Sequence, residues 1–456
     1  MPNPAASETV TTPVPAPPHR SASPSTPLGG DGLAVRFAHV RKRSCALAAP
    51  VTAEDAMLQS MDDASPTKWH LAHTTWFFER FVLAASSGYH DVNADWDYLF
   101  NSYYQSVGPM HARHRRGVLS RPSLAEVMDY RAQVDARMLR AFERGDFEPV
   151  VRDRIELGLH HEQQHQELLL TDIKHAFWCN PLRPAYRSDL PVARGQSDAT
   201  EWLRQEESIV EIGVPAWPAD ATAFAFDNES PRHRVLMPAH LLASRPVSNA
   251  DFRAFVDDGG YRQAALWLSD GWSRINQDGW VRPFYWDEPL ECEFTLGGMR
   301  AIDPDAPVSH LSYYEADAFA RWAGARLPTE VEWEHAAAPL PVAGNFVDRG
   351  FLHPAPAQSR GQAGGRDDAG VVAGIVPRQM FGDVWEWTSS AYTAYPGFRE
   401  MPGSLGEYNG KFMSGQLILR GGSCVSSRDH LRPSYRNFFH APDRWQFSGV
   451  RLARDA

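Results

Sequence analysis

Cysteine is scarce in this sequence, and an excess of basic charge is lacking. Only four cysteines occur among 456 residues, far apart and without CxxC or zinc-ribbon spacing. This excludes a disulfide framework and cysteine-built zinc modules, and it is typical of reduced thiols in a cytoplasmic protein. The 56 acidic residues outnumber the 45 basic ones, which argues against binding to nucleic acids or membrane surfaces by basic attraction.

Long hydrophobic runs and internal repeats are also missing. No run of about 18 apolar residues occurs, so no transmembrane helix is expected. The N-terminus lacks the basic-then-apolar pattern of a secretory signal, and we therefore expect a cytoplasmic location. Nothing in the sequence indicates the oligomeric state. Hydrophobic residues nevertheless make up 43% of the chain, which is enough to build a large core.

The composition divides the chain into four parts. Residues 1–33 are rich in Pro, Ser, Thr and Ala, which predicts a disordered tail. Residues 34–185 carry apolar side chains at three- and four-residue spacing, and we predict an antiparallel helix bundle. Residues 186–211 are polar and mixed, as in a linker. In residues 212–456 short β-like runs alternate with Gly, Pro and Trp, which predicts a loop-rich α+β domain.

Local signals define several helices more closely. Ser123 stands three residues before Glu126, a capping-box pattern that marks a helix start. Residues 156–177 predict one long helix in the first half. In the second half only residues 249–256 and 313–323 have a clear helical pattern.

The long predicted helix carries a histidine pair. His161 and His165 are four residues apart, so their side chains lie on one helix face and could chelate one metal ion. The same segment matches the H-E-x-x-H motif of zinc hydrolases, in which Glu162 would act as general base. None of the longer forms of that motif follows it. The residues alone therefore leave open a zinc hydrolase, another metal enzyme, or structural histidines.

An earlier predicted helix offers a third ligand. Its aromatic sequence contains His70 and His73, and either could join the later pair inside the bundle. Three neutral imidazoles suit iron, zinc, copper or nickel and leave coordination positions open for a substrate. The alternative is that His70 and His73 are hydrogen-bonded core residues.

A tyrosine pair and an arginine-rich turn follow this helix. Tyr103 and Tyr104 precede Arg113 and Arg116 by about ten residues. These side chains could offer a phenol and guanidinium groups to an anionic substrate. A basic surface cluster beside two packing aromatic residues is the alternative.

Several motifs together resemble one enzyme family. The W-x-L-x-H motif that ends at His73 and the H-x-x-x-H-x-E motif from His161 to Glu167 resemble the DinB-like half of the ergothioneine-biosynthesis sulfoxide synthases. The second half resembles a formylglycine-generating-enzyme-type (sulfatase-modifying-factor) domain. The resemblance covers nearly everything from residue 34 to the end. The supporting segments of the second half are RLPTEVEWE (326–334), GDVWEWT (382–388), RGGS (420–423) and FSGVR (447–451).

This resemblance implies a fold and a reaction. The fold would be a DinB-like four-helix bundle followed by a formylglycine-generating-enzyme-like, C-type-lectin-like α+β domain. The enzyme would use non-haem Fe(II) and O2 to join a thiol sulfur to the imidazole C2 of hercynine (Nα-trimethylhistidine), with oxidation to a sulfoxide. The implied iron ligands are His73, His161 and His165, which leaves Glu162 without a catalytic role.

The resemblance also implies residues that bind hercynine. Gln164 matches a glutamine that contacts hercynine, and Asn437, Phe438 and Phe439 match the segment that lines the trimethylammonium pocket. The mycobacterial pattern has Trp-Asp after the asparagine, where this sequence has two phenylalanines. We therefore expect cation–π contacts in place of a carboxylate counter-charge.

The thiol-binding residues follow from the same resemblance. Arg113 and Arg116 match residues that hold the thiol substrate's carboxylate. The Tyr103–Tyr104 pair resembles the branch that uses free cysteine, and we expect L-cysteine as the thiol, with Tyr104 as proton donor and Tyr103 as the next candidate. The mycobacterial branch uses γ-glutamylcysteine and has its tyrosine in the C-terminal half. γ-Glutamylcysteine, an ovothiol- or selenoneine-type reaction, a zinc hydrolase and a non-catalytic binding module are the alternatives.

Overall fold

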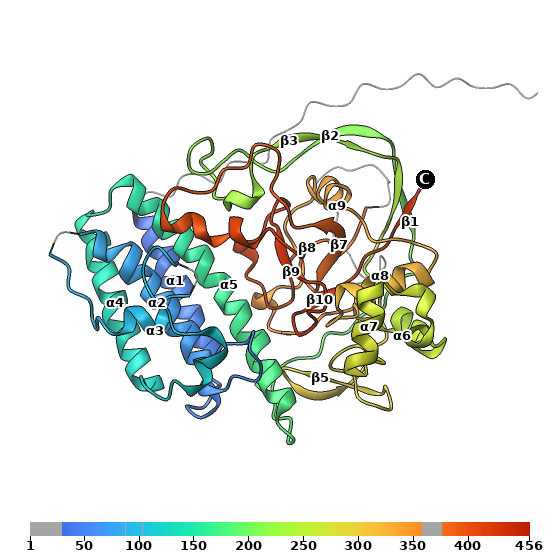
Figure 1. The fold of residues 1–456 in the computed structure, drawn as a ribbon, viewed down its shortest axis with the longest axis horizontal. Coiled ribbons are helices and arrows are strands. Elements are labelled where there is room, and N and C mark those ends of the chain that lie inside the picture. The colour runs from blue at the N-terminus through green and yellow to red at the C-terminus, as the bar shows by residue number, and fades with distance from the viewer. Residues whose placement is uncertain (1–29, 87, 103, 358–375) are drawn as a thin grey trace, which may run out of the picture.

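A helical half and a mixed α+β half lie side by side in the structure (Figure 1). The structure, a computed structural model, describes residues 30–86, 88–102, 104–357 and 376–456. The helical half precedes the mixed half in the chain, which is the multidomain order that the sequence predicts. The longest helix of the described residues, α5 (Pro149–Cys179), runs along the boundary between the two halves (Figure 1).

Four long helices form the N-terminal bundle. The central helix is α2, in which every residue from 67 to 79 is buried, because α2 packs against α1, α4 and α5. The predicted capping box of Ser123 and Glu126 is present at the start of α4. The predicted long helix is also confirmed and extends further at both ends. The helices are α1 (Gly30–Ala48), α2 (Thr67–Phe81), the short α3 (Trp96–Phe100), α4 (Leu124–Arg144) and α5 (Pro149–Cys179).

The first helix begins earlier than the composition predicts. The expected tail covers residues 1–33, but α1 begins at Gly30. Leu33 is buried with Phe37 and Phe78 in one hydrophobic cluster. This tertiary packing stabilises a helical turn within the predicted tail. Residues 1–29 lie outside the described residues.

The predicted linker over residues 186–211 contains regular structure. It holds β1 (Trp202–Gln205) and nearly all of β2 (Ser208–Ile212), and Tyr186 and Leu190 are buried. β1 pairs antiparallel with β4, and β2 pairs antiparallel with β3. These ladders give partners to backbone groups of the segment, which its polar composition does not indicate.

Small sheets and short helices make up the mixed half. The four-stranded sheet has the order β10-β7-β8-β9, in which only the β10–β7 pair is parallel, and a three-stranded sheet has the order β1-β4-β11. Two hairpins, β2-β3 and β5-β6, complete the strands of the described residues. The remaining strands are β3 (His233–Met237), β4 (His240–Ala243), β5 (Cys292–Thr295), β6 (Gly298–Ala301), β7 (Trp385–Ala391), β8 (Gln416–Arg420), β9 (Asn437–His440), β10 (Ser448–Gly449) and β11 (Ala453–Asp455).

In the described parts of the mixed half, four helices accompany these sheets, two more than the sequence predicts. The predicted ones are α6 (Asn249–Asp257) and α8 (Tyr313–Trp322). The additional ones are α7 (Ser269–Asp278) and α9 (Glu330–Ala337), and α9 starts with a capping box formed by its N-cap Thr329.

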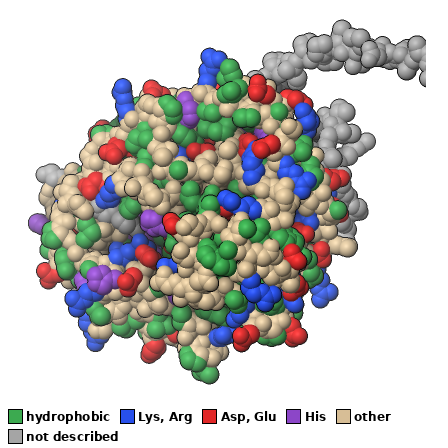
Figure 2. Space-filling view, turned by 45° about the vertical axis from the view of Figure 1, so that its right-hand side comes forward, with side chains coloured by type: hydrophobic (Ala, Val, Ile, Leu, Met, Phe, Trp, Pro, Cys, Tyr) green, Lys and Arg blue, Asp and Glu red, His purple; other side chains and the backbone are tan. Residues whose placement is uncertain are grey.

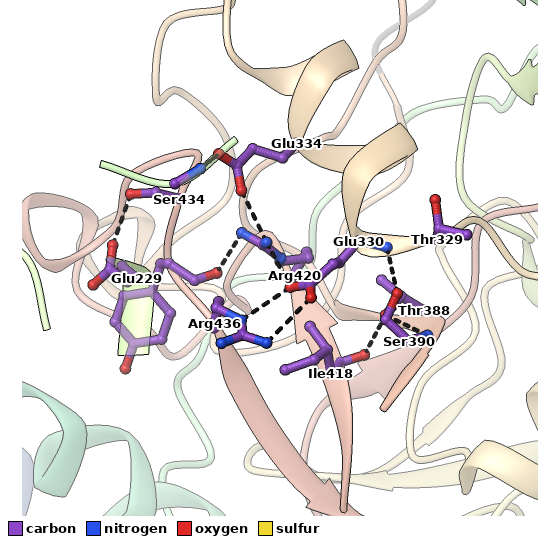
Figure 3. A network of polar contacts seen from close by, with 12 residues as sticks. Glu229, Thr329, Glu330, Glu334, Thr388, Ser390, Ile418, Arg420, Ser434 and Arg436 are labelled. Atoms are coloured by element: carbon purple, nitrogen blue, oxygen red, sulfur yellow. Dashed lines mark hydrogen bonds and ion pairs between the residues drawn. The ribbon is translucent and has the colours of Figure 1, made fainter. Parts of the chain in front are cut away.

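A buried ion-pair network joins α9 to β8 and to the start of β9 (Figure 3). Nη2 of Arg420 lies 2.8 Å from Oε2 of Glu330 and 2.9 Å from Oε2 of Glu334. Arg436 lies 3.0 Å from the same Glu330 oxygen. Because each buried charge has a partner of opposite sign, the desolvation cost is offset and the geometry is fixed. The network therefore anchors the backbone immediately before Asn437.

A carboxylate of α5 ties the two halves together. Glu167 accepts hydrogen bonds from Trp385 Nε1 (2.6 Å), Ser423 Oγ (2.8 Å) and Ser426 Oγ (2.6 Å), all in the mixed half. One hydrophobic core also includes residues of both halves. Because of this packing, the side chains one helical turn before Glu167 on α5 lie next to the mixed half.

The surface carries charges of both signs. On the face drawn in Figure 2, acidic, basic and hydrophobic side chains are interspersed. Among the described residues, no helix combines the length and the apolar character needed to cross a bilayer. All four cysteines are free thiols, of which Cys424 is buried and Cys179 exposed.

Candidate metal centre and substrate cavity

Three histidines converge between α2 and α5. His73 of α2 and His161 and His165 of α5 are buried, and one nitrogen of each lies within 4.8 Å of the others. The Nε2 atoms of His73 and His161 are 3.2 Å apart. Two nitrogens bound at right angles to one metal ion, each at about 2.1 Å, would be about 3.0 Å apart. This spacing fits a shared ion.

Neighbouring groups aim these imidazoles at one point. His73 Nδ1 lies 2.6 Å from the carbonyl oxygen of Phe100, which leaves its Nε2 facing His161. His165 Nδ1 lies 2.9 Å from His70 Nδ1, and His70 Nε2 lies 3.0 Å from Asp172 Oδ2. His70 is thus outside the converging group and orients His165 from behind, as the outer partners of metal-binding histidines do.

Burial keeps the three imidazoles neutral. It lowers the pKa of His161 to about 3. Burial, reinforced by repulsion from His161, holds the pKa values of His73 and His165 well below their ordinary range. Neutral imidazole is the form that binds metals. Three such donors without a carboxylate fit iron, zinc, copper or nickel.

Glu162 is committed to an ion cluster away from this centre. It pairs with Arg41 Nη1 at 2.9 Å and with Arg131, and it accepts a hydrogen bond from Ser44 Oγ at 2.5 Å. Burial alone would raise the pKa of Glu162, but the two arginines lower it to about 2. A carboxylate held in this way is a poor general base at neutral pH, which argues against a zinc hydrolase.

A cavity of about 240 Å³ opens beside the histidines. The bundle contributes His165 to its wall, and strand β9 contributes Asn437, Phe438, Phe439 and His440. Phe438 stacks on Tyr392 with 4.0 Å between ring centroids, and Phe439 meets Trp445 edge-on at 5.8 Å. The predicted site residues that this cavity brings together are Arg113, Gln164, His165, Asn437, Phe438 and Phe439.

Other predicted residues lie elsewhere. Arg116 is buried, stacks over the Trp69 ring at 3.4 Å and donates to Ser65 and Ser102, so it does not line the cavity wall. The sequence could not separate it from Arg113, because both belong to one short basic turn. Trp69 in turn stacks on His73 with 4.6 Å between ring centroids, so Arg116 supports the histidine centre from behind this tryptophan.

Tyr104, the predicted proton donor, does not line this cavity either. Tyr104 is buried, with its ring 4.9 Å from that of Phe81. Phe77 packs against both Tyr104 and His161, so an apolar ring lies beside each of them. Tyr103 lies outside the described residues.

A tyrosine that the residue patterns did not predict lies beside the histidine triad. The Tyr408 ring is 5.6 Å from that of His161, lines the cavity and donates its O–H to Gln164 Oε1. Tyr408 ends a 3-10 helix, Ser404–Tyr408, whose Glu407 accepts hydrogen bonds from the backbone N–H groups of Gln105 and Ser106. The only sequence signal for it was the C-terminal tyrosine of the mycobacterial branch.

Asp443 is a second residue that the patterns missed. It lines the cavity near β9 and accepts a hydrogen bond from the His440 backbone N–H at 3.0 Å. Burial and, to a smaller extent, Asp63 raise the pKa of Asp443 against the opposing effects of His440 and Arg113, and the net pKa is about 6. The cavity therefore gains a negative charge as the pH rises through about 6.

Comparison with known proteins assigns the chain to a family. Residues 36–169 match the DinB superfamily, and residues 198–362 and 374–456 match the sulfatase-modifying factor enzyme 1-like domain. Over 442 residues the chain is 35% identical to the hercynine oxygenase of Mycolicibacterium thermoresistibile, which covers 93% of this chain and 94% of that protein. The chain belongs to the hercynine oxygenase family.

Other relatives agree with this assignment. The hercynine oxygenase of Mycobacterium tuberculosis is 34% identical over 443 residues, with 93% of this chain and 98% of that protein covered. Ergothioneine biosynthesis protein 1 of Schizosaccharomyces pombe is 26% identical over 238 residues, with 51% of this chain and 28% of that protein covered. Membership in the hercynine oxygenase family confirms the predicted resemblance and fold class, and it makes this chain an oxygenase.

Proposed function

We propose that this chain is a non-haem Fe(II)- and O2-dependent sulfoxide synthase of ergothioneine biosynthesis. It joins the sulfur of a cysteine-type thiol to the imidazole C2 of hercynine, which with L-cysteine gives hercynylcysteine sulfoxide. The C2–H and S–H bonds break, C–S and S–O bonds form, and the second oxygen atom leaves as water. The observation that carries the proposal is the buried triad His73, His161 and His165 beside a cavity that is lined by His165 and by residues of β9.

The side chains of the site have separate proposed roles in metal binding and substrate binding. The three histidines would hold Fe(II), which when bound activates O2 for reaction with the thiol. Gln164 and Asn437 offer amide groups to hercynine, because both line the cavity. Phe438 and Phe439 offer aromatic faces to its trimethylammonium group. Holding both substrates in one cavity replaces an improbable encounter by a fixed geometry.

The thiol donor is L-cysteine or γ-glutamylcysteine. Tyr408 lies beside His161 whereas Tyr104 lies in an aromatic cluster, so the position of the tyrosine no longer favours free L-cysteine. Arg113 lines the cavity and can pair with a carboxylate of either thiol. Both thiols and Fe(II) are kept reduced in the cytoplasm, which is the location we propose.

Anaerobic reconstitution tests the proposed function. The protein is loaded with Fe(II) or Zn(II), then mixed with O2, hercynine and either thiol, and the products are read by mass spectrometry. We expect a sulfoxide and O2 uptake with Fe(II) only, and the larger kcat/KM identifies the thiol. Histidine in place of hercynine tests the ovothiol-type reaction. Absence of O2 uptake and of any coupled product with both thiols would contradict the proposal.

Removing an aromatic face is expected to weaken hercynine binding. Phe439→Leu keeps apolar volume but loses the cation–π contact, worth about 0.5–2 kcal/mol, so the hercynine KM should rise about 2- to 30-fold. Phe438→Leu should have the smaller effect, because the Tyr392 ring already covers one of its faces. Steady-state kinetics with each substrate varied measures both. An unchanged hercynine KM in both variants, or an equal rise in the thiol KM, would count against this role.

The charge of Asp443 predicts a pH dependence of hercynine binding. Its raised pKa leaves the carboxyl neutral below about 6 and ionised above it. The charged form attracts a trimethylammonium group, so the hercynine KM should fall by about two- to five-fold from pH 5 to pH 7. His440, Asp63 and Arg113 face the same carboxyl and are unchanged in Asp443→Asn. That variant should lose this part of the profile, and an identical profile in both proteins would refute the role.

A further inference from the structure

A chain of polar contacts leads from α5 into the mixed half. It starts with an ion-pair contact of 3.4 Å between Glu156 Oε1 and His160 Nε2. His160 Nδ1 lies 2.9 Å from His430 Nδ1. His430 Nε2 lies 3.0 Å from the Tyr435 hydroxyl. Both histidines and Tyr435 are buried, whereas the Glu156 side chain is 20% exposed.

The chain continues to the substrate cavity. Gln164 Nε2 donates to the Tyr435 hydroxyl at 2.6 Å, and Tyr408 donates its O–H to Gln164 Oε1. Tyr435, Gln164 and Tyr408 all line the cavity. The Glu156 carboxylate, near the surface of α5, is therefore linked through three side chains, His160, His430 and Tyr435, to Gln164 and Tyr408, two groups that would face hercynine.

The carboxylate determines the direction of every bond in this chain. Burial raises the pKa of Glu156, but the hydrogen bond from His160 and the positive charge of Arg36 outweigh this and lower it to about 2. Glu156 is thus ionised and can only accept, so His160 carries its proton on Nε2. Both rings are buried and their Nδ1 atoms lie 2.9 Å apart, an arrangement that favours two neutral rings with one proton each.

The remaining directions follow one by one. The unprotonated Nδ1 of His160 accepts from His430 Nδ1–H, and the unprotonated Nε2 of His430 accepts from the Tyr435 O–H. The Tyr435 oxygen then accepts from the Gln164 amide N–H. A reversed chain would turn the Gln164 amide over and would point a lone pair of His160 at the Glu156 carboxylate, which is repulsive.

We propose that Glu156, His160 and His430 are positioning residues that fix the orientation of the Gln164 amide and of the Tyr408 hydroxyl. The amide has two N–H groups and gives one to Tyr435, so the second is a donor for the cavity. The ligand atom that meets Gln164 must then be an acceptor, such as a carboxylate oxygen or an unprotonated imidazole nitrogen. Only the identity of this ligand as hercynine rests on the proposed function.

Two matched variants separate this role from a structural one. Arg36 holds Glu156 through contacts of 2.6 and 2.8 Å. Glu156→Gln and Arg36→Gln both remove that ion pair, but only Glu156→Gln removes the obligatory acceptor. We expect Glu156→Gln to raise the hercynine KM about 3- to 10-fold with the thiol KM unchanged, and Arg36→Gln to stay within about two-fold of wild type. Equal effects of the two variants would overturn the proposal.

The protonation of the rings gives a readout that needs neither iron nor substrate. Nitrogen-15 NMR of the histidine-labelled wild-type protein at pH 7.5, with His430→Asn used for assignment, should find His430 protonated on Nδ1 and His160 on Nε2. A proton on His430 Nε2 would overturn the proposal even if the enzyme makes the sulfoxide. If the enzyme makes no sulfoxide but these tautomers are found, the proposed function fails and the positioning chain stands.

Discussion

Replacing His161 by alanine is expected to abolish iron binding and to lower O2-dependent turnover by about a thousand-fold. Its Nε2 lies 3.2 Å from that of His73, and its Nδ1 has no hydrogen-bond partner within the described part of the chain. The side chain therefore has no polar contact to lose other than those of the histidine centre. Iron content after anaerobic reconstitution and dialysis measures the first effect, and O2 uptake measures the second.

Variants of two further histidines, with smaller expected effects on iron binding, provide the comparison for this prediction. His70→Ala removes the support of His165 but no member of the triad, and such outer partners typically contribute 10- to 100-fold in metal affinity. His114, on the exposed basic turn, provides a control: His114→Ala should bind iron like the wild type. If His161→Ala kept full iron content, the three histidines would not be the metal site and the proposed function would lose its foundation.

The histidine centre could be predicted only partly from residue patterns. The spacing of His161 and His165 is enough, because helical geometry alone puts residues four apart on one face. His70 and His73 could not be separated in this way, since both lie on one helix. The difference between them depends on Phe100 and Asp172, which are distant in sequence, and only the family resemblance favoured His73.

The wall of the cavity was harder to predict from the sequence. Tyr408 ends a short, glycine-containing 3-10 helix without hydrophobic periodicity. Its position depends on Glu407, which accepts hydrogen bonds from the backbone of a loop some three hundred residues earlier. The helix α9 was missed for a related reason. Its Glu330 and Glu334 are buried because they pair with Arg420, so charged residues occupy positions where a hydrophobic stripe would be expected.

We propose Tyr408, which lies beside His161 and lines the cavity, as the proton donor in place of Tyr104. Tyr408→Phe is then expected to lower sulfoxide formation by about a hundred-fold, since loss of a general acid typically costs 10²–10⁴-fold. The thiol would instead be oxidised by O2 to its sulfinate, because the cavity would still hold thiol and iron together. Mass spectrometry of both products, with O2 uptake as the total, measures the ratio of sulfoxide to sulfinate.

Tyr104→Phe provides the matched comparison, because it removes the same oxygen atom from a ring packed against Phe81 and Phe77. We expect its product ratio to stay within about two-fold of wild type, since proton transfer requires hydrogen-bond reach. Tyr408→Phe also breaks the bond to Gln164, which changes the hercynine KM, but KM alone does not redirect the product at saturating hercynine. A shift toward sulfinate in Tyr104→Phe and not in Tyr408→Phe would transfer the proton-donor role back to the helical half and restore free L-cysteine as the expected thiol.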